Sequence, residues 1–247
     1  MFEPRVALAS LSGESDADWA RTGAEYAGAA FLGAIALDAE SRAAARKLVE
    51  RDRNEFLPDD PLAFVDDQLA ALDDAPLRPG FNVRSTTVEP VREVAGICAE
   101  HDAMLEVNAH CRQPELCAVG CGETLLADTG RLVEYVEAAA DPGATVSVKV
   151  RTEVEGVDLA ATARAVEEGG AEIVHVDAMD SEAVVADVVD ATDLFVIANN
   201  EVRDARSVRE YLAYGADAVS VGRPSDRPAV LSRVRESTDR WFGGVTA

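Results

Sequence analysis

Short apolar segments alternate with amphipathic segments eight times along this chain of 247 residues. Continuous apolar runs flanked by turn or polar residues are typical of parallel strands buried on both faces. The expected strands are Arg5–Ser10, Ala30–Leu37, Gly80–Val83, Met104–Ala109, Thr145–Arg151, Glu172–Asp177, Leu194–Asn199 and Ala218–Gly222. The segments between them carry helix signals, such as the aspartate cap and terminal glycine pair of Asp158–Gly169. Ser181–Ala191 and Ser207–Gly215 repeat this pattern.

Strict alternation of strand and helix predicts a parallel sheet, and eight such units in about 250 residues predict that the sheet closes. We therefore expect an α/β protein, a (β/α)8 TIM barrel that forms a single domain over residues 1–247. An open, doubly wound sheet is the alternative. The first expected strand is not followed by the glycine fingerprint of dinucleotide-binding sheets, which counts against that alternative.

The second strand–helix unit is longer than the others. Between Leu37 and Gly80, two helical stretches, Ala39–Arg53 and Leu62–Leu72, are joined by Leu-Pro-Asp-Asp-Pro. Barrels vary mostly in the loops at their C-terminal face. Residues 38–79 are therefore expected to be an insertion that either forms a wall of a substrate site or adds packing. At the other end of the chain, Pro228–Phe242 is expected to form a closing helix.

Acidic residues outnumber basic ones two to one, 46 against 23, which gives a net charge of −23. Such a charge destabilises a compact chain in dilute buffer, whereas the Debye length of about 3 Å at molar salt screens the repulsion. We therefore expect a halophilic protein, with an acidic protein from an ordinary cytoplasm as the alternative. Acidity normally counts against nucleic-acid binding, but the same screening weakens that argument. The charge thus indicates the environment and not the partner.

Neither a secretory signal nor a membrane span is visible in the sequence. The segment Met1–Ala9 contains Glu3 and Arg5 and lacks the apolar core of a signal peptide. No apolar run approaches the roughly 18 residues that a membrane-spanning helix needs. The expectation is a cytoplasmic protein with no membrane partner.

Polar residues recur where the expected strands end. In a barrel these positions meet at one face and carry the chemistry. The candidates are Ser10, Asn82, Asn108, Lys149, Arg151, Asp177, Asn199, Asn200, Gly222 and Arg223, with Cys111 just beyond the fourth strand. Lys149 is one of only two lysines and lies in an apolar strand. A buried lysine is costly unless a carboxylate or a ligand pairs with it.

One segment carries a specific motif. Glu106-Val-Asn108-Ala-His-Cys111 is followed by Gly120-Cys-Gly122 and then by Leu125-Leu126. It resembles the signature of the dihydrouridine synthases, in which a strand ends in Asn-x-Gly-Cys-Pro and a Gly-x-Gly follows before Leu-Leu. Further segments are similar to other strands of that family: Val6–Ser10 with Ser15-Asp16, Val146–Arg151, Ile197–Asn199 and Gly215–Arg223.

The resemblance implies an FMN-dependent oxidoreductase that reduces the C5–C6 bond of uridine in tRNA, with NAD(P)H or another reductant as electron donor. It implies Cys111 as the catalytic general acid. It implies substrate binding by Asn108, Lys149 and Arg151. The cofactor residues it implies are Ser10, Asn82, Lys149, Asp177, Asn199, Asn200, Gly222 and Arg223. Lys149 would lie near the pyrimidine edge of the flavin, where positive charge stabilises the reduced anion.

Four departures from the family pattern keep other functions open. Arg112 follows Cys111 where the family has proline, Asn200 stands where it usually has glycine, and Asp177 replaces its histidine, with His175 two residues earlier. The sequence also leaves no room for the family's C-terminal helical tRNA-binding domain. The alternatives are a flavin-dependent reductase or dehydrogenase of a free pyrimidine, similar to dihydroorotate or dihydropyrimidine dehydrogenases, and a non-catalytic phosphate- or flavin-binding barrel.

The four cysteines do not suggest a disulfide framework in a chain of this length and type. Cys111, Cys117 and Cys121 are spaced C-x5-C-x3-C, which fits no common zinc or iron–sulfur pattern. We therefore expect no metal. Cys98, Cys117 and Cys121 are expected to be small buried hydrophobes.

Overall fold

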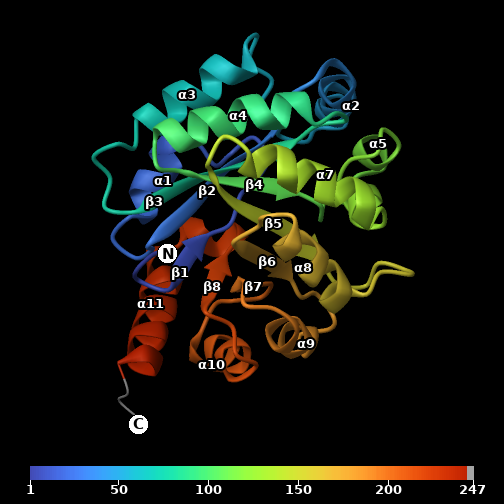
Figure 1. The fold of residues 1–247 in the computed structure, drawn as a ribbon. Helices are drawn as coiled ribbons and strands as arrows, with labels where there is room; N and C mark the ends of the chain where they lie inside the picture. The colour runs from blue at the N-terminus through green and yellow to red at the C-terminus, as the bar shows by residue number, and fades with distance from the viewer. Residues whose placement is uncertain (244–247) are drawn as a thin grey trace.

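Eight parallel strands close into a barrel in sequence order in the computed structural model, which describes residues 1–243 (Figure 1). The predicted (β/α)8 fold is confirmed. The strands are β1 Val6–Leu8, β2 Ala29–Ala36, β3 Arg78–Arg84, β4 Met104–Asn108, β5 Thr145–Arg151, β6 Ile173–Asp177, β7 Phe195–Asn199 and β8 Ala218–Val221. The clearest differences from expectation are β1, which is shorter, and β3, which extends by two residues to Arg78 at its start and by one to Arg84 at its end.

Helices surround the barrel (Figure 1). They are α1 Ala17–Gly23, α2 Ala39–Val49, α3 Pro61–Ala70, α4 Glu89–Glu100, α5 Pro114–Cys117, α6 Glu123–Leu126, α7 Thr129–Ala140, α8 Leu159–Glu168, α9 Val184–Ala191, α10 Ala205–Ala213, the 3-10 turn η1 Arg223–Asp226, and α11 Pro228–Phe242. Aspartate side chains accept backbone N–H bonds at the N-termini of α1, α2, α3, α7, α8 and α10. Part of the acidic excess therefore satisfies helix ends.

The two expected helices that differ most from the structure are longer in the sequence pattern. The expected Ala39–Arg53 ends at Val49, because the chain turns at Asp52, whose φ is 58°. The expected Ser181–Ala191 begins only at Val184, because its first residues form turns with i to i+3 backbone bonds, such as the bond from the Val184 N–H to the Ser181 carbonyl.

The N-terminal end of the barrel interior is apolar. Its layer is built from Ala7, Ala29, Phe31, Met104, Ile173, Ile197 and Ala218, and Phe2 packs against it. Gly80 is required here, since a Cβ on it would lie 2.8 Å from the Phe31 ring. This packed floor leaves the polar groups of the barrel to its middle and its C-terminal end.

The overlong segment 38–79 contains α2 and α3 and returns to the barrel between them. Phe56 forms a β-bridge with Ile35, near the end of β2. Glu55 and Arg84, at the end of β3, form an ion pair at 2.7 Å with both side chains buried. The middle of the segment therefore contacts the C-terminal ends of β2 and β3.

Candidate functional site

A cavity of about 240 Å³ opens where β1, β5, β6, β7 and β8 end. Seven of the candidate residues from the sequence line it: Ser10, Lys149, Asp177, Asn199, Asn200, Gly222 and Arg223. His110, Met179, Glu201 and Arg203 contribute to the same wall. The strand-end rule thus brings together residues that are more than 200 positions apart in the chain.

The other four candidates lie outside this cavity. Asn82 and Asn108 are buried beneath the barrel mouth, where the Asn108 amide donates to Asn82 Oδ1 at 2.7 Å. Arg151 pairs with Glu123 at 2.8 Å on the neighbouring side. Cys111 follows His110 in the β4–α5 loop and is partly buried.

The loops after β7 and β8 have the features that a phosphate needs. A Cβ on Gly222 would meet no atom within 4 Å, so the backbone there is open to a ligand, and the Arg223 side chain stands beside it. Asn200 has a φ of 110°, the conformation that glycine favours and that the usual family glycine would take. The Tyr211 hydroxyl donates to its carbonyl at 3.0 Å and fixes the loop.

Lys149 is 1% exposed and adds a buried positive charge to the cavity, which Arg203 and Arg223 also line. Burial lowers its pKa, while the carboxylates of Glu106 and Asp177 oppose this change. Asp177 Oδ1 is buried and has no hydrogen-bond partner within residues 1–243. An acceptor of this kind inside a polar cavity is suited to a ligand N–H or hydroxyl group.

A fully buried polar network lies below the cavity. Glu106 Oε2 accepts from His175 Nδ1 at 2.7 Å and Oε1 accepts from the Asn82 amide at 2.7 Å. Because the carboxylate can only accept, His175 donates from Nδ1, and its Nε2 meets the Ser220 hydroxyl at 2.7 Å. Burial and the Lys149 charge lower the pKa of His175, while the Glu106 carboxylate opposes this change.

The sequence reading did not assign a role to this network. Glu106, His175 and Ser220 lie on inward-facing positions of β4, β6 and β8, one layer below the strand ends. The feature of the sequence that could have indicated this network is Glu106, a charged residue in the middle of an apolar strand, two positions before Asn108. Strand periodicity of two places both side chains on the barrel's inner face.

The loop after β4 is folded so that its cysteine is held in place. Asn108 Oδ1 accepts the backbone N–H of Cys111 at 3.1 Å. The Glu123 N–H donates to the Cys111 carbonyl at 2.8 Å, and Gly122 makes this approach possible. A Cβ on Gly122 would lie 2.0 Å from that carbonyl oxygen. The second glycine of the motif is therefore needed to close the loop.

The remaining cysteines take different positions. Cys98 and Cys121 are buried, and burial raises the pKa of both thiols to about 12. Cys117 is only partly buried, so the expectation of a buried hydrophobe is wrong for it. Its Sγ lies 3.5 Å from the Cys111 carbonyl oxygen, close enough for the thiol to donate. Within residues 1–243 no group of three His, Cys, Asp or Glu side chains is arranged to hold a metal ion.

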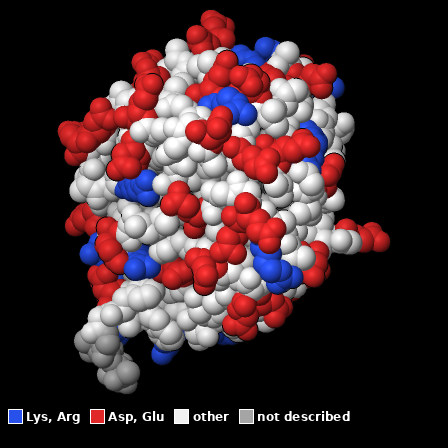
Figure 2. All heavy atoms as spheres, in the orientation of Figure 1, with Lys and Arg blue, Asp and Glu red and all other residues white. Residues whose placement is uncertain are grey.

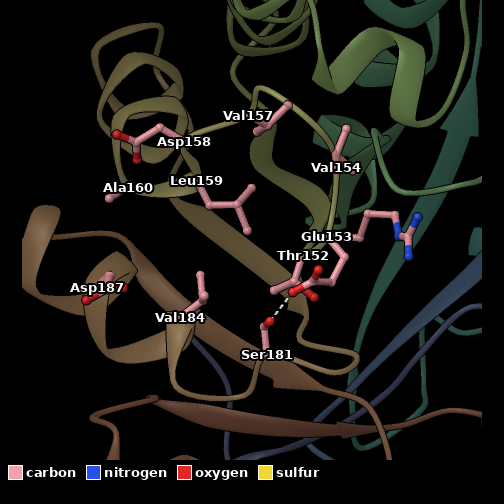
Figure 3. Close-up of a pocket in the computed structure, with 11 residues that line it drawn as sticks. Thr152, Glu153, Val154, Val157, Asp158, Leu159, Ala160, Ser181, Val184 and Asp187 are labelled. Carbon is pink, nitrogen blue, oxygen red and sulfur yellow. Dashed lines mark hydrogen bonds between the residues drawn. The ribbon is translucent and has the colours of Figure 1, made fainter.

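A second, wider hollow of about 590 Å³ lies beside Arg151, between the β5–α8 loop and the start of α9 (Figure 3). Val154, Val157, Leu159 and Val184 give it an apolar lining, and Glu153, Asp158 and Asp187 supply negative charge. It is adjacent to the barrel mouth and offers neutral or cationic groups a better environment than phosphates.

Acidic side chains are spread over the surface, with basic ones scattered between them (Figure 2). Among residues 1–243 no helix is both long and apolar enough to cross a bilayer.

The fold and the polar strand ends place this chain in the class of (β/α)8 barrels with a polar cavity at the C-terminal face. Its sequence then specifies the family, because a model of the dihydrouridine synthases matches residues 81–241, more than half of the chain. The chain belongs to the dihydrouridine synthase family, a family of oxidoreductases. The resemblance drawn from the Cys111 motif is confirmed.

Individual proteins are similar to this chain in sequence or in fold. An uncharacterised protein of Methanocaldococcus jannaschii is 25% identical over 237 residues, which cover 90% of this chain and 89% of that protein. Morphinone reductase in complex with tetrahydroNAD superposes with a TM-score of 0.66 at 15% identity, covering 95% of this chain and 87% of the reductase. Thiamine phosphate pyrophosphorylase of Pyrococcus furiosus gives 0.57 at 11% identity, covering 98% and 97%.

Proposed function

We propose that this protein is an FMN-dependent oxidoreductase that reduces the C5–C6 bond of a uridine in tRNA, with NAD(P)H or another reductant as electron source. The observation that carries the proposal is the arrangement at the barrel mouth. Cys111 is held there by Asn108 and Gly122. The adjoining cavity is lined by the Lys149 side chain and by the open backbone at Gly222.

The residues of the cavity fit FMN. The open space at Gly222 with Arg223, together with the Asn199–Asn200 turn, would hold the phosphate. Lys149 would stabilise negative charge on the reduced ring, and the buried Asp177 Oδ1, which has no partner among residues 1–243, would accept from an N–H or hydroxyl group. When bound, FMN supplies the hydride that is added at C6.

Cys111 then has the role of general acid. Hydride addition at C6 leaves negative charge across C5 and O4, and a proton must reach C5. Thiols are largely protonated at neutral pH, so Cys111 can supply that proton. Asn108 would orient the base only indirectly, because its amide is occupied by Asn82 and its oxygen by the loop. Arg151, paired with Glu123 on the same rim, would contact the substrate.

The experiment compares single cysteine variants in high-salt buffer. The purified protein should show flavin absorbance, with FMN released on denaturation. Cys111→Ala should keep its FMN and the rate of flavin reduction, while reduction of tRNA uridine slows by a factor of about 10² to 10⁴, as for loss of a general acid. Cys117→Ala is the matched control from the same loop and should stay within a few-fold of the parent.

The results that would contradict the proposal are distinct. A colourless protein that gains no absorbance with added FMN would favour a non-catalytic phosphate-binding barrel. Equal losses in all three cysteine variants of the loop would indicate a metal or cluster site.

A free pyrimidine is the second candidate substrate. The hollow beside Arg151 favours it, because its apolar and acidic lining suits a neutral ring better than phosphate groups. Turnover of free uracil or an orotate-like ring, with none of unmodified tRNA, would establish this alternative.

A further inference from the structure

His110 is a partly buried histidine that the proposed reaction does not use. It directly precedes Cys111 in the motif Asn108-Ala-His-Cys, at the position where the family pattern Asn-x-Gly-Cys has a glycine and therefore no side chain. It also lines the cavity at the barrel mouth. A side chain added at this place changes what the cavity offers to a ligand.

Hydrogen bonds at both ends fix the orientation of the Asn108 amide. Its Oδ1 accepts the Cys111 backbone N–H at 3.1 Å, which an amide NH2 group could not do. Its Nδ2 donates to Asn82 Oδ1 at 2.7 Å, and Asn82 Nδ2 donates in turn to Glu106 Oε1 at 2.7 Å. Because a carboxylate only accepts, the bonds run in one direction toward Glu106. The Asn108 oxygen therefore faces the β4–α5 loop.

This oxygen fixes the tautomer of His110. His110 Nδ1 lies 3.2 Å from Asn108 Oδ1, and an amide oxygen only accepts, so Nδ1 carries the proton and donates. Burial, and after it the Lys149 charge, hold the pKa of His110 well below its usual range, which favours the neutral ring. The second nitrogen, Nε2, then carries a lone pair. It makes no hydrogen bond to any residue among 1–243 and is free to accept one from a ligand.

The backbone places His110 next to Lys149. The Ala109 N–H donates to the Lys149 carbonyl at 2.9 Å, so His110 follows the last bond between β4 and β5. Both side chains line the same cavity. An ammonium donor beside an imidazole acceptor complements an imide, in which a carbonyl oxygen accepts and the adjoining N–H donates.

Asn82 cannot supply this acceptor, although the family resemblance implies it as a cofactor residue. It is fully buried, and both polar atoms of its amide are bonded inside the barrel, to Glu106 and to Asn108. The competing acceptor in the cavity is Asp177 Oδ1, which is buried without a partner among residues 1–243.

We propose that His110 is a binding residue whose Nε2 accepts the N–H of an imide ring in this cavity, while Lys149 donates to an adjoining carbonyl oxygen. Uracil and the pyrimidine end of a flavin both present this group. The inference rests on the proposed function, which brings both rings to the barrel mouth. It excludes cytosine from the same place, because cytosine has a lone pair on the ring nitrogen where uracil has a hydrogen.

The first measurement determines the tautomer without any ligand. Two-dimensional ¹H–¹⁵N NMR of side chains distinguishes a neutral ring protonated at Nδ1 from one protonated at Nε2, and the chain has only 3 histidines. The signals missing from His110→Leu identify the ring. At neutral pH His110 should be neutral and protonated at Nδ1. A ring protonated at Nε2, or at both nitrogens, overturns the proposal because it has no acceptor.

The second measurement compares ligands that differ at one N–H group. Calorimetry at molar salt gives the affinities of uracil, 3-methyluracil and cytosine, and mass spectrometry after denaturation gives the ratio of FMN to 3-methyl-FMN bound from an equal mixture. In one of the two series the parent should prefer the N–H ligand at least about fivefold more strongly than His110→Leu does, as expected for one hydrogen bond. Cytosine, which adds no bulk at the ring nitrogen, should bind as poorly as 3-methyluracil if the uracil series responds.

His110→Gln is the conservative variant, because its amide oxygen can take the place of Nε2, and it should restore most of the preference. A preference that His110→Leu loses in the uracil series assigns the imide to the substrate, and one lost in the flavin series assigns it to the cofactor. A purely structural role would weaken all ligands alike and leave both ratios unchanged.

Three results overturn the proposal. The first is equal ratios in the parent and His110→Leu in both series. The second is no saturable binding of any of these rings to the parent. The third is a preference that survives in His110→Leu and is lost in Asp177→Ala, which would make Asp177 the acceptor.

Neither measurement needs turnover, so failure of the inference and failure of the proposed function can be told apart. If the ratios respond to His110→Leu but no pyrimidine is reduced, the ring recognition stands and the proposed function fails. If turnover depends on Cys111 while both ratios stay equal, the proposed function stands and the role of His110 is lost.

Discussion

Replacing Glu106 by glutamine should be among the most destabilising conservative changes in this protein. The carboxylate is fully buried and accepts bonds from Asn82, Ser147 and His175, and it balances the Lys149 charge. Glutamine turns one acceptor into a donor that faces another donor, and it leaves Lys149 with Asp177 alone. Removing one partner of a buried charge pair costs about 3–5 kcal/mol. At about 2–4 °C per kcal/mol for 150–250 residues, the melting temperature should fall by roughly 6–20 °C.

Thermal unfolding followed by circular dichroism at molar salt measures this change. The control is Asp239→Asn, which breaks the Arg235–Asp239 pair on α11, whose side chains are 34% and 50% exposed. An exposed pair contributes less than about 1 kcal/mol. If Glu106→Gln costs no more than the control, the buried network is not a charged one and the reasoning is refuted.

The pH dependence of Glu106 has a defined sign. Burial alone would raise its pKa, but His175, Lys149 and the Asn82 hydrogen bond together lower it. A lowered carboxyl pKa contributes stability that is present above the ordinary value of 4.5 and is lost as the pH falls through the folded value. Acid unfolding of the parent should therefore be steeper than that of the glutamine variant.

Two further predictions concern the surface. Lowering salt from molar to about 0.1 M lengthens the Debye length from about 3 to 10 Å. Because the net charge is −23, self-repulsion should then grow and the melting temperature should fall. Equal melting temperatures at both salt concentrations would remove the case for a halophile. Bonds to Asp66 and, more weakly, Asp73 raise the pKa of His101 against the effect of burial. The contribution of His101 to the free energy of unfolding is complete below the ordinary histidine pKa of 6.5 and is lost as the pH rises through its pKa in the folded protein. Denaturant titrations at a series of pH values should show this loss of stability for the parent and not for His101→Gln.

The fold could be predicted because its signal is periodic and local. Each strand of this barrel is buried on both faces, so it reads as a short apolar run, and aspartates mark many of the helix starts. Helix boundaries are harder to predict where contacts between residues distant in the sequence surround them. Just before α9, for example, Ser181 contacts Glu153 from a different loop, and no local pattern in the sequence shows this contact.

Only those residues of the candidate site that stand at strand ends or in the cysteine motif could be predicted from the sequence. These two features find Lys149, Gly222 and Cys111 because each stands at a strand end or in a spaced pattern. They give no reason to single out Arg84 or Glu55, because this pairing depends on how a 42-residue segment, 38–79, folds back onto the barrel. Periodicity alone could have singled out Glu106 as inward-facing, but its partners lie on β3, β5 and β6.

The surface and the interior of this protein differ in their balance of acidic and basic residues. Acidic residues outnumber basic ones two to one overall, yet the charged side chains buried within residues 1–243 include three cations, Arg84, Lys149 and Arg151, beside the carboxylates of Glu106 and Glu55. All three cations end strands or lie near their ends, at the face that carries the cavity. Salt screens exposed charges far more than buried ones. Molar salt can therefore screen the repulsion across the surface, while the buried pair of Arg84 and Glu55 at the barrel mouth keeps most of its strength.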